Sequence, residues 1–282
     1  MHPSEVKTLG LWHQDRITSF RENLRPNRIA VVLSDLHVGA NNSLLPSPFE
    51  LLDGTTILGN AIHLDIFAKW KLFWKIVRYW GYDSIYFLGD LPSATSHRFH
   101  NNSVLDIMDL DNQKEALYQL LKVPCAGVET HFISGTNTAH DSIDTKVHLD
   151  LAKRLGGKFH YSGKIVERIG PHYVEMGHQA RLGALYPSGV LEREAIFQGF
   201  GISSKRTKDI RNRIGGHFHM WEEINKNGFV ITTVPGWQDY YPIKGKIVYE
   251  GIRTPDIGGM VLLSTDDGVL TIPYVFELPS GE

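Results

Sequence analysis

Short apolar runs that end in Asp, Asn or His residues constrain this chain more than any other feature of its sequence. Three such runs lie in the first half, at residues 29–33, 85–88 and 128–133. Apolar runs of this length between turn signals are typical of buried strands. Helix-like patterns separate them, and strands that alternate with helices indicate an α/β fold.

The clearest helix pattern lies between the first two runs. Its apolar residues recur at spacings of three and four, at Ile62, Ile66, Trp70, Phe73, Val77 and Trp80. Gly81 ends the pattern, and we expect the tryptophans to pack in the core. A shorter helix is expected from Asp111, its predicted N-cap, to about residue 122. Another would be capped by Asp141 or Ser142 and end at residues 156–157.

The second half of the chain is mostly strand-like. Short segments with turns between them lie at residues 164–169, 172–176, 229–234, 245–249, 259–263 and 269–275. The two halves together predict an α/β fold with two packed sheets and helices outside them. We expect an N-terminal extension over residues 1–28 and a single domain over residues 29–282.

Composition sets limits on the class of protein. The 282 residues carry a formal charge of −2, which gives no general attraction to nucleic acid or to an anionic membrane. The chain has one cysteine, Cys125, and its sequence contains no apolar stretch of membrane-spanning length and no secretion signal. We therefore expect a cytoplasmic protein. Histidine is abundant, with 14 residues, which raises the question of whether they cluster.

The residues that follow the strand-like runs are suited to binding metal ions. Polar side chains come directly after four of these runs, at Asp35, His37, Asp90, Asn137, His140 and His178, and after a further short strand-like piece before Gly215, at His217 and His219. In α/β sheets a ligand site lies beyond the carboxyl ends of the strands, where loops converge. The glycines next to Asp90, His178 and His217 allow tight turns and a close approach to an ion.

Two pairs, Asp35/His37 and His217/His219, are spaced two residues apart. In an extended chain, side chains at this spacing point to the same face, so each pair can reach one ion or two adjacent ions. Carboxylate and imidazole together suit Mn, Fe or Zn and do not suit calcium. Two such ions about 3.5–4 Å apart favour phosphoryl displacement, and Asp90, alone in its loop, fits a bridging role. Each motif taken singly also fits a structural or surface role; their ordered conjunction is what indicates a metal site.

These motifs resemble those of the calcineurin-like metallophosphoesterases. The family pattern is D-x-H, G-D-x-x-D, G-N-H-D/E, a lone H and G-H-x-H, and the resemblance spans residues 35–219. It implies a four-layer α/β/β/α sandwich and two divalent metal ions. Mn²⁺ is the first candidate for these ions, and Fe, Zn and Ni are the alternatives. It also implies a distribution of ligands: Asp35, His37 and His219 on one ion, His178, Asn137 and His217 on the other, and Asp90 between them.

Two motifs depart from the family pattern. Ser93 stands where the family has a second Asp, which orients the catalytic histidine. The third motif reads G-T-N-T-A-H-D and resembles a G-T-x-x-H form of phage-type members. Asn137 is the predicted ligand in it, with Thr136 or water as the alternative. His140 is the predicted proton donor, with Asp141 or Asp144 to orient it.

Substrate contacts are expected from basic side chains near these motifs. Arg98, Arg181 and Arg206 are candidates for binding phosphate, although solvated loops account for them equally well. Arg206 lies in a basic run over residues 205–213, which fits either a solvated face or a nucleic-acid contact. Trp237 and its neighbours Tyr240 and Tyr241 fit core packing better than stacking on a base. Five further histidines have no partner motif and are predicted to be structural or exposed: His13, His63, His131, His148 and His160.

The sequence therefore predicts a metal-dependent hydrolase of phosphate mono- or diesters. In the family it resembles, a metal-bridging water attacks phosphorus without a covalent intermediate. The expected substrate is a phosphorylated small molecule, a nucleotide or a nucleic acid. Two alternatives stay open: a DNA nuclease of the same family, and an interaction module that keeps the fold with little or no catalysis.

Overall fold

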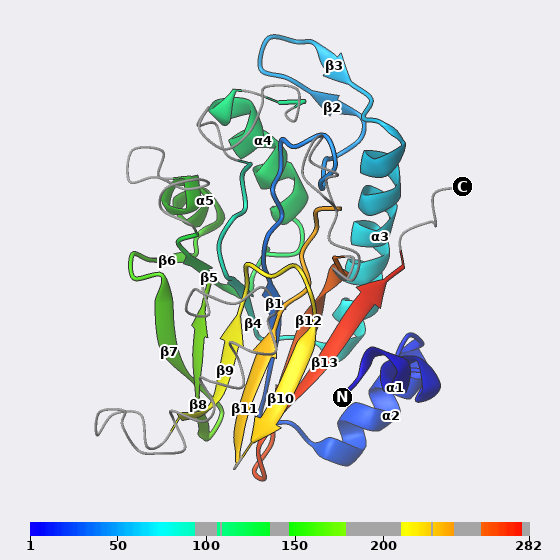
Figure 1. Cartoon of the computed structure of the whole chain (residues 1–282), viewed down its shortest axis with the longest axis vertical. Coiled ribbons are helices and arrows are strands. Elements are labelled where there is room, and N and C mark those ends of the chain that lie inside the picture. The colour runs from blue at the N-terminus through cyan, green and yellow to red at the C-terminus, as the bar shows by residue number, and fades with distance from the viewer. Residues whose placement is uncertain are drawn as a thin grey trace, which may run out of the picture.

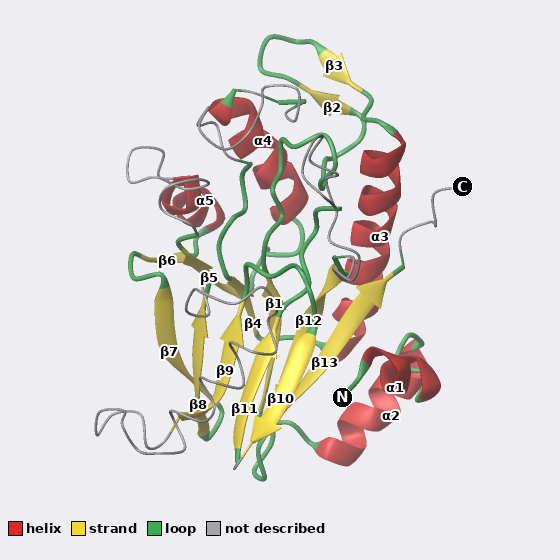
Figure 2. Ribbon diagram, in the orientation of Figure 1, coloured by secondary structure: helices red, strands yellow, loops and turns green. Residues whose placement is uncertain are grey.

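The computed structural model describes residues 1–93, 106–107, 109–135, 147–178, 210–226, 228–239 and 255–277. Two sheets pack face to face, and helices lie beside the larger one (Figures 1 and 2). The predicted α/β fold class with two packed sheets is thereby confirmed.

The larger sheet has six strands. Their order is β13 (Val269–Phe276), β12 (Ile257–Ser264), β1 (Arg28–Leu33), β4 (Ser84–Phe87), β5 (Glu129–Ile133) and β6 (Lys158–His160). Strands β1, β4, β5 and β6 are parallel to one another, whereas β12 is antiparallel to both of its neighbours. The carboxyl ends of β1, β4 and β5 therefore meet at one edge of this sheet.

The smaller sheet has five strands. Their order is β10 (Glu222–Lys226), β11 (Phe229–Thr233), β9 (Ile210–Gly215), β8 (His172–Gly177) and β7 (Lys164–Ile169). Strands β8 and β9 are parallel, and their last residues, Gly177 and Gly215, are register partners. Their carboxyl ends thus also lie together. A separate hairpin joins β2 (Phe49–Glu50) and β3 (Thr56–Ile57).

Five α-helices are described. They are α1 (Pro3–Thr8), α2 (Gln14–Leu24), α3 (Ala61–Val77), α4 (Leu110–Leu121) and α5 (Val147–Leu155), and a 3-10 turn, η1 (Arg78–Trp80), continues α3. Gly81 ends that turn with a left-handed φ of 62°, as the sequence predicts. The predicted N-cap of α4 is wrong: Asp109, not Asp111, accepts the Asn112 N–H, and Asp111 already lies in the first turn.

Two apolar clusters separate the layers. One lies between the helices and the six-stranded sheet and contains residues from all five α-helices together with Trp70, Trp80 and Trp237, all 3% exposed or less. The predicted core role of these tryptophans is therefore correct. The other cluster lies between the sheets and includes Val32, Leu88, Ile133, Val174 and Met176.

The first 28 residues are packed onto the body of the protein. Val6, Leu11 and Ile17 are buried in the helix-side cluster, and the Tyr274 hydroxyl donates to the Leu11 carbonyl at 2.8 Å.

The described chain forms three of the four predicted layers, with all its α-helices on the side of the six-stranded sheet. No helix within the described ranges is long and apolar enough to cross a membrane.

Candidate metal centre

The loops that follow four strands meet at one place. After β1 and β4, the Asp35 N–H donates to the Gly89 carbonyl and the His37 N–H to the Asp90 carbonyl, both at 3.1 Å. After β8 and β9, the Gly216 N–H donates to the Gly177 carbonyl at 3.1 Å. The Asp35 side chain joins the two sheets because its Oδ2 accepts the His217 N–H at 2.7 Å.

Backbone strain is concentrated in these loops. Among the described residues, a left-handed φ at a non-glycine position occurs at Arg25 and at five of the polar residues that follow the strands: Asp35, His37, Asp90, His217 and His219. Their φ angles lie between 46° and 78°, a region that side chains with a Cβ seldom occupy. Such outliers cluster at functional sites, where the surrounding structure holds them in place.

Glycines allow these loops to approach closely. A Cβ on Gly216 would lie 2.0 Å from the Ser34 hydroxyl oxygen, and a Cβ on Gly135 would lie 2.1 Å from Asp90 Oδ1. Neither position can hold a larger residue without displacing its neighbour. The role of Gly216 beside His217 agrees with the sequence prediction, whereas the contact of Gly135 with Asp90 was not predicted.

Potential ligand atoms converge in two overlapping groups. One group consists of Asp35, His37 and His219, and the other of Asp35, Asp90, His178 and His217, with the ligand atoms of each group within 4.8 Å of one another. Asp35 belongs to both groups, whereas Asp90 belongs to one. We refer to these six residues together as the strand-end centre.

The first group brings one carboxylate oxygen and two imidazole nitrogens close together. Oδ1 of Asp35 accepts no hydrogen bond from any described residue, although the carboxylate is fully buried. It lies 3.4 Å from His219 Nε2 and 3.7 Å from His37 Nε2, and the two Nε2 atoms lie 3.1 Å apart. A buried carboxylate oxygen without a donor is costly, and a cation between these three atoms would satisfy it.

One of the two histidines of the second group is oriented by the backbone. Nδ1 of His178 lies 2.8 Å from the Leu88 carbonyl and donates to it, which leaves Nε2 directed at Asp90 Oδ2, 3.0 Å away. A carbonyl partner on one ring nitrogen is how proteins fix the tautomer and orientation of a metal-binding histidine. The ring of His217 lies 5.1 Å from that of His178.

Protonation compensates the negative charge of this centre. Burial would lower the pKa of His178, but the carboxylates of Asp90 and Asp35 outweigh it and raise this pKa to about 9. Burial likewise opposes protonation of His219, but Asp35 raises its pKa. Burial would raise the pKa of Asp35, but the charges of His219 and His178 hold it well below its usual value.

The other two histidines of the strand-end centre stay neutral. Burial lowers the pKa of His37 and that of His217. Two carboxylates and four imidazoles, two of them neutral, form a donor set that suits divalent transition metals. The residues present therefore fit divalent metal ions.

The predicted extended backbone at the ligand pairs spaced two residues apart is wrong. Asp35 and His37 have φ angles of 55° and 46°, so the backbone is not extended there, and the left-handed turns bring both side chains to the first group. His217 and His219 also have positive φ, and they join different groups.

Several predicted site residues lie outside the described ranges: Arg98, Asn137, His140, Arg181 and Arg206. Thr136, Asp141, Asp144, Tyr240 and Tyr241 lie outside them too.

Ser93 is buried, and its N–H donates to the Val38 carbonyl at 2.8 Å. The end of the basic run lies in β9, where Arg213 pairs with Glu175 at 3.0 Å.

The structure also adds residues that the sequence did not single out. The Asp256 N–H donates to the His219 carbonyl at 2.7 Å, and its Oδ2 accepts the Trp221 N–H at 2.8 Å, so Asp256 holds the loop that carries His219. His131 and His160, which the sequence predicts to be structural or exposed, lie together, with a ring nitrogen of each facing the other at 3.0 Å. No local spacing signals either contact.

No protein-family model and no curated protein matches this chain. Among solved structures, it is similar to a single mutant of Vps29 from Entamoeba histolytica, with 14% identity and a TM-score of 0.44 over 88% of this chain and 99% of that one. It is also similar to an archaeal phosphodiesterase, with 11% identity, a TM-score of 0.42, and coverage of 87% and 99%. A protein described as a predicted phosphoesterase, from Streptococcus pneumoniae TIGR4, shows 10% identity, a TM-score of 0.35, and coverage of 88% and 98%. Likeness at this level says nothing about activity, which depends on the side chains of the site.

Proposed function

We propose that this chain is a metal-dependent phosphoesterase that hydrolyses phosphate mono- or diesters at the strand-end centre. The observation that carries the proposal is the fully buried Asp35 carboxylate, which is common to two groups of metal-type ligands and has one oxygen without a hydrogen bond from the described residues. Two adjacent ligand groups that share a carboxylate are the arrangement expected of a dinuclear site.

Each ligand has a distinct task in this proposal. Asp35, His37 and His219 would hold one divalent ion, and His178, His217 and Asp90 would help to hold a second, with Mn²⁺ the first candidate and Fe, Zn or Ni the alternatives. When bound, such ions polarise a phosphoryl oxygen and lower the pKa of water at the site. The Leu88 carbonyl keeps Nε2 of His178 turned toward Asp90.

The remaining catalytic assignments rest on the sequence. Asn137 is the proposed further ligand, and His140 is the proposed donor of a proton to the leaving oxygen. Arg98, Arg181 and Arg206 are the proposed phosphate contacts. Within the broad substrate class, a small phosphodiester, a nucleotide and a nucleic acid are all compatible with this set of groups.

Metal-dependent turnover tests the proposal directly. The metal-stripped chain is supplied with Mn²⁺ and assayed on p-nitrophenyl phosphate, bis-p-nitrophenyl phosphate and a short DNA. We expect turnover of at least one substrate, its loss in Asp90→Ala, and its retention in Asp111→Ala, whose side chain is 69% exposed on α4. The absence of metal-dependent turnover on all three substrates would refute the enzyme and favour the interaction module. Preference for the DNA would favour the nuclease.

A further inference from the structure

A second cluster of metal-type side chains lies at the edge where the two sheets meet. His131 comes from β5, His160 from β6 and Glu167 from β7, and their ligand atoms lie within 4.8 Å of one another. We call these three residues the sheet-edge cluster. It shares no residue with the strand-end centre.

Strand register directs all three side chains into the space between the sheets. His131 stacks on Tyr86, a member of the inter-sheet apolar cluster, with ring centroids 4.5 Å apart. His160 is the register partner of Ile133, which belongs to the same cluster. Glu167 lies midway between Ile165 and Ile169 on β7, and both isoleucines also face this space.

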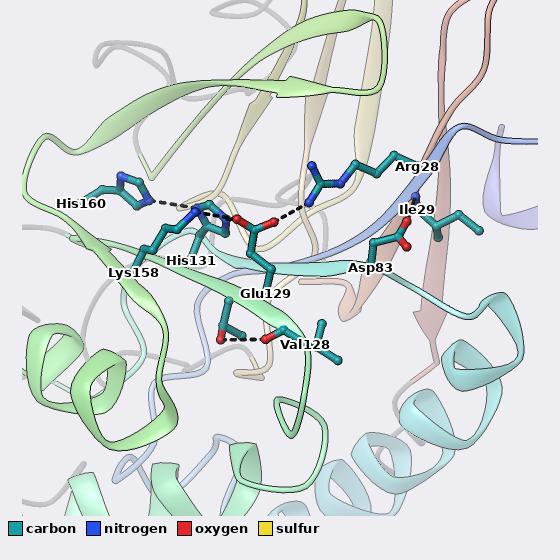
Figure 3. Close-up of polar contacts among 9 residues, drawn as sticks. Arg28, Ile29, Asp83, Val128, Glu129, His131, Lys158 and His160 are labelled. Atoms are coloured by element: carbon teal, nitrogen blue, oxygen red, sulfur yellow. Dashed lines mark hydrogen bonds and ion pairs between the residues drawn. The ribbon is translucent and has the colours of Figure 1, made fainter.

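The two imidazoles are already placed as a chelating pair. Nδ1 of His131 lies 3.0 Å from Nε2 of His160, and the rings are nearly parallel, with an angle of 3° between them (Figure 3). Two nitrogens bound to one tetrahedral Zn²⁺ at about 2.0–2.1 Å are about 3.3 Å apart. On metal binding the distance between the two nitrogens therefore has to grow by only a few tenths of an ångström, and two bonds to the ion would replace the hydrogen bond between the rings.

A neighbouring carboxylate favours the tautomer that a metal requires. Oε1 of Glu129 lies 3.3 Å from Nε2 of His131, which favours the proton on that nitrogen and leaves the lone pair of Nδ1 directed toward His160. Both oxygens of Glu129 are occupied, Oε1 by Lys158 at 2.6 Å and Oε2 by Arg28 (Figure 3). Glu129 thus orients His131 and is not itself a ligand.

Glu167 supplies the unbalanced charge of the cluster. It is half-buried, and within the described ranges it acts on His160 through its charge, without a hydrogen bond or ion pair. A cation held by the carboxylate and the two neutral imidazoles would balance this partly buried negative charge. Two histidines and one glutamate form a known ligand set for zinc, with a fourth position left for water.

We propose that His131, His160 and Glu167 bind a Zn²⁺-type ion that joins the edge of the six-stranded sheet to that of the five-stranded sheet. Because β6 and β7 are the edge strands of their sheets, the ion would link strands that no ladder hydrogen bonds connect. This site is independent of the phosphoesterase proposal.

Zinc binding in a chain with a disabled strand-end centre tests the proposal. The double variant Asp35→Asn/His217→Asn provides this background, and circular dichroism verifies its fold. Equilibrium dialysis with elemental analysis is expected to find one zinc per chain. Adding Glu167→Gln or His160→Gln, which alter half-buried side chains without opening a core cavity, should weaken zinc binding by at least about tenfold.

A matched change at an exposed histidine controls for loss of a surface ligand. His13→Gln in the same background should leave zinc affinity unchanged, because His13 lies at the exposed start of α2. Co²⁺ in place of zinc adds a spectroscopic readout, since its visible bands should report nitrogen ligation that His160→Gln removes. Equal zinc affinity with and without Glu167→Gln, or a background chain that holds no zinc, would overturn the proposal.

Discussion

The strand-end centre and the sheet-edge cluster gather similar side chains by opposite means. In the strand-end centre the ligands lie on loops, and five of its six residues have a left-handed backbone. In the sheet-edge cluster all three residues lie on regular strands, and none has a positive φ. Loops can aim several ligands at one point only by holding unfavourable backbone angles, whereas strand register brings side chains together without strain.

This difference predicts different tolerance to substitution. Each strained residue of the strand-end centre is held by its neighbours through main-chain and side-chain bonds, so a change at one position disturbs several. The sheet-edge cluster draws its geometry from sheet pairing, which a single side-chain change leaves in place. Metal binding should therefore be lost cooperatively at the strand-end centre and one ligand at a time at the sheet-edge cluster.

The largest effect is expected from Asp35→Asn. This change neutralises the carboxylate common to both ligand groups while the amide oxygen can still accept the His217 N–H. We expect metal-dependent turnover to fall by at least about a hundredfold, a loss comparable to removal of a key electrostatic group. Steady-state kinetics with saturating Mn²⁺ measure it. Wild-type turnover would contradict the role of Asp35, and Asp111→Asn serves as the matched control.

The second effect is a dependence of metal affinity on pH. The pKa of His178 is raised to about 9, so this side chain is protonated at neutral pH, and a metal ion must displace its proton. Release of this one proton should make affinity at the strand-end centre rise by at least about tenfold per pH unit from 7 toward 9 and then level off. Titration calorimetry in buffers of different ionisation enthalpy counts the protons released.

The sheet-edge cluster should behave differently under the same conditions. Burial lowers the pKa of His131 to about 4 and also lowers that of His160, so both rings are neutral from pH 7 to 9. Zinc affinity in the Asp35→Asn/His217→Asn background should stay constant over this range. If metal affinity changed with pH in the same way at both sites, the predicted contrast between them would be wrong.

The third effect concerns the close approach of loops in the strand-end centre. In Gly135→Ala the new Cβ would lie 2.1 Å from Asp90 Oδ1 and 2.4 Å from the Asp90 backbone nitrogen, so the carboxylate and the loop that carries it must move. We expect about a tenfold loss of metal affinity, with the fold preserved, because precise placement of ligands determines affinity. Gly268→Ala is the control, since its Cβ would have no atom within 4 Å. Equal affinity in the two variants would show that the Gly135 contact is dispensable.

The sequence predicts the strand-end centre because its ligands directly follow strands, which are apolar before Asp35 and Asp90 and more polar before His217. That signal is local: β1 and β4 are recognisable as short apolar runs, and Asp35 and Asp90 come after them. Which ligand is common to both groups, however, cannot be predicted from the local sequence. The sequence assigns the bridging role to Asp90 from its isolation in the loop, but in the structure Asp35 is common to both groups because it lies between the two sheets.

The sheet-edge cluster could not be predicted in this way. His131 and His160 are separated by 29 residues, and their contact depends on the parallel register of β5 and β6. Glu167 joins them only because the two sheets pack face to face. The fold shows a similar division. Strand β12 is apolar and is predicted, whereas β10 has the polar sequence EEINK and is missed. Pairing with β11 makes β10 a strand although its composition does not indicate one.

The smallest effect is expected from Glu129→Gln, which weakens the support of the sheet-edge cluster. Hydrogen bonds from Lys158 and Arg28 lower the pKa of Glu129 from its ordinary value of 4.5 to about 2, although burial acts in the opposite direction. A lowered pKa means that the ionised side chain stabilises the fold above pH 4.5 and loses this effect as the pH falls toward 2. Because 35% of the side chain is exposed, screening should keep the contribution below about 1 kcal/mol.

Urea midpoints of the wild type and Glu129→Gln, measured between pH 7 and pH 3, detect this contribution. The gap between the two chains should be constant from pH 7 to pH 5 and should narrow below pH 4.5. Glu277→Gln removes a far more exposed partner of Lys7 and should leave the midpoint unchanged at neutral pH. A constant gap down to pH 3 would mean that Glu129 supports His131 through its shape and hydrogen bonding and not through its charge, and the sheet-edge cluster would then keep its geometry in acid.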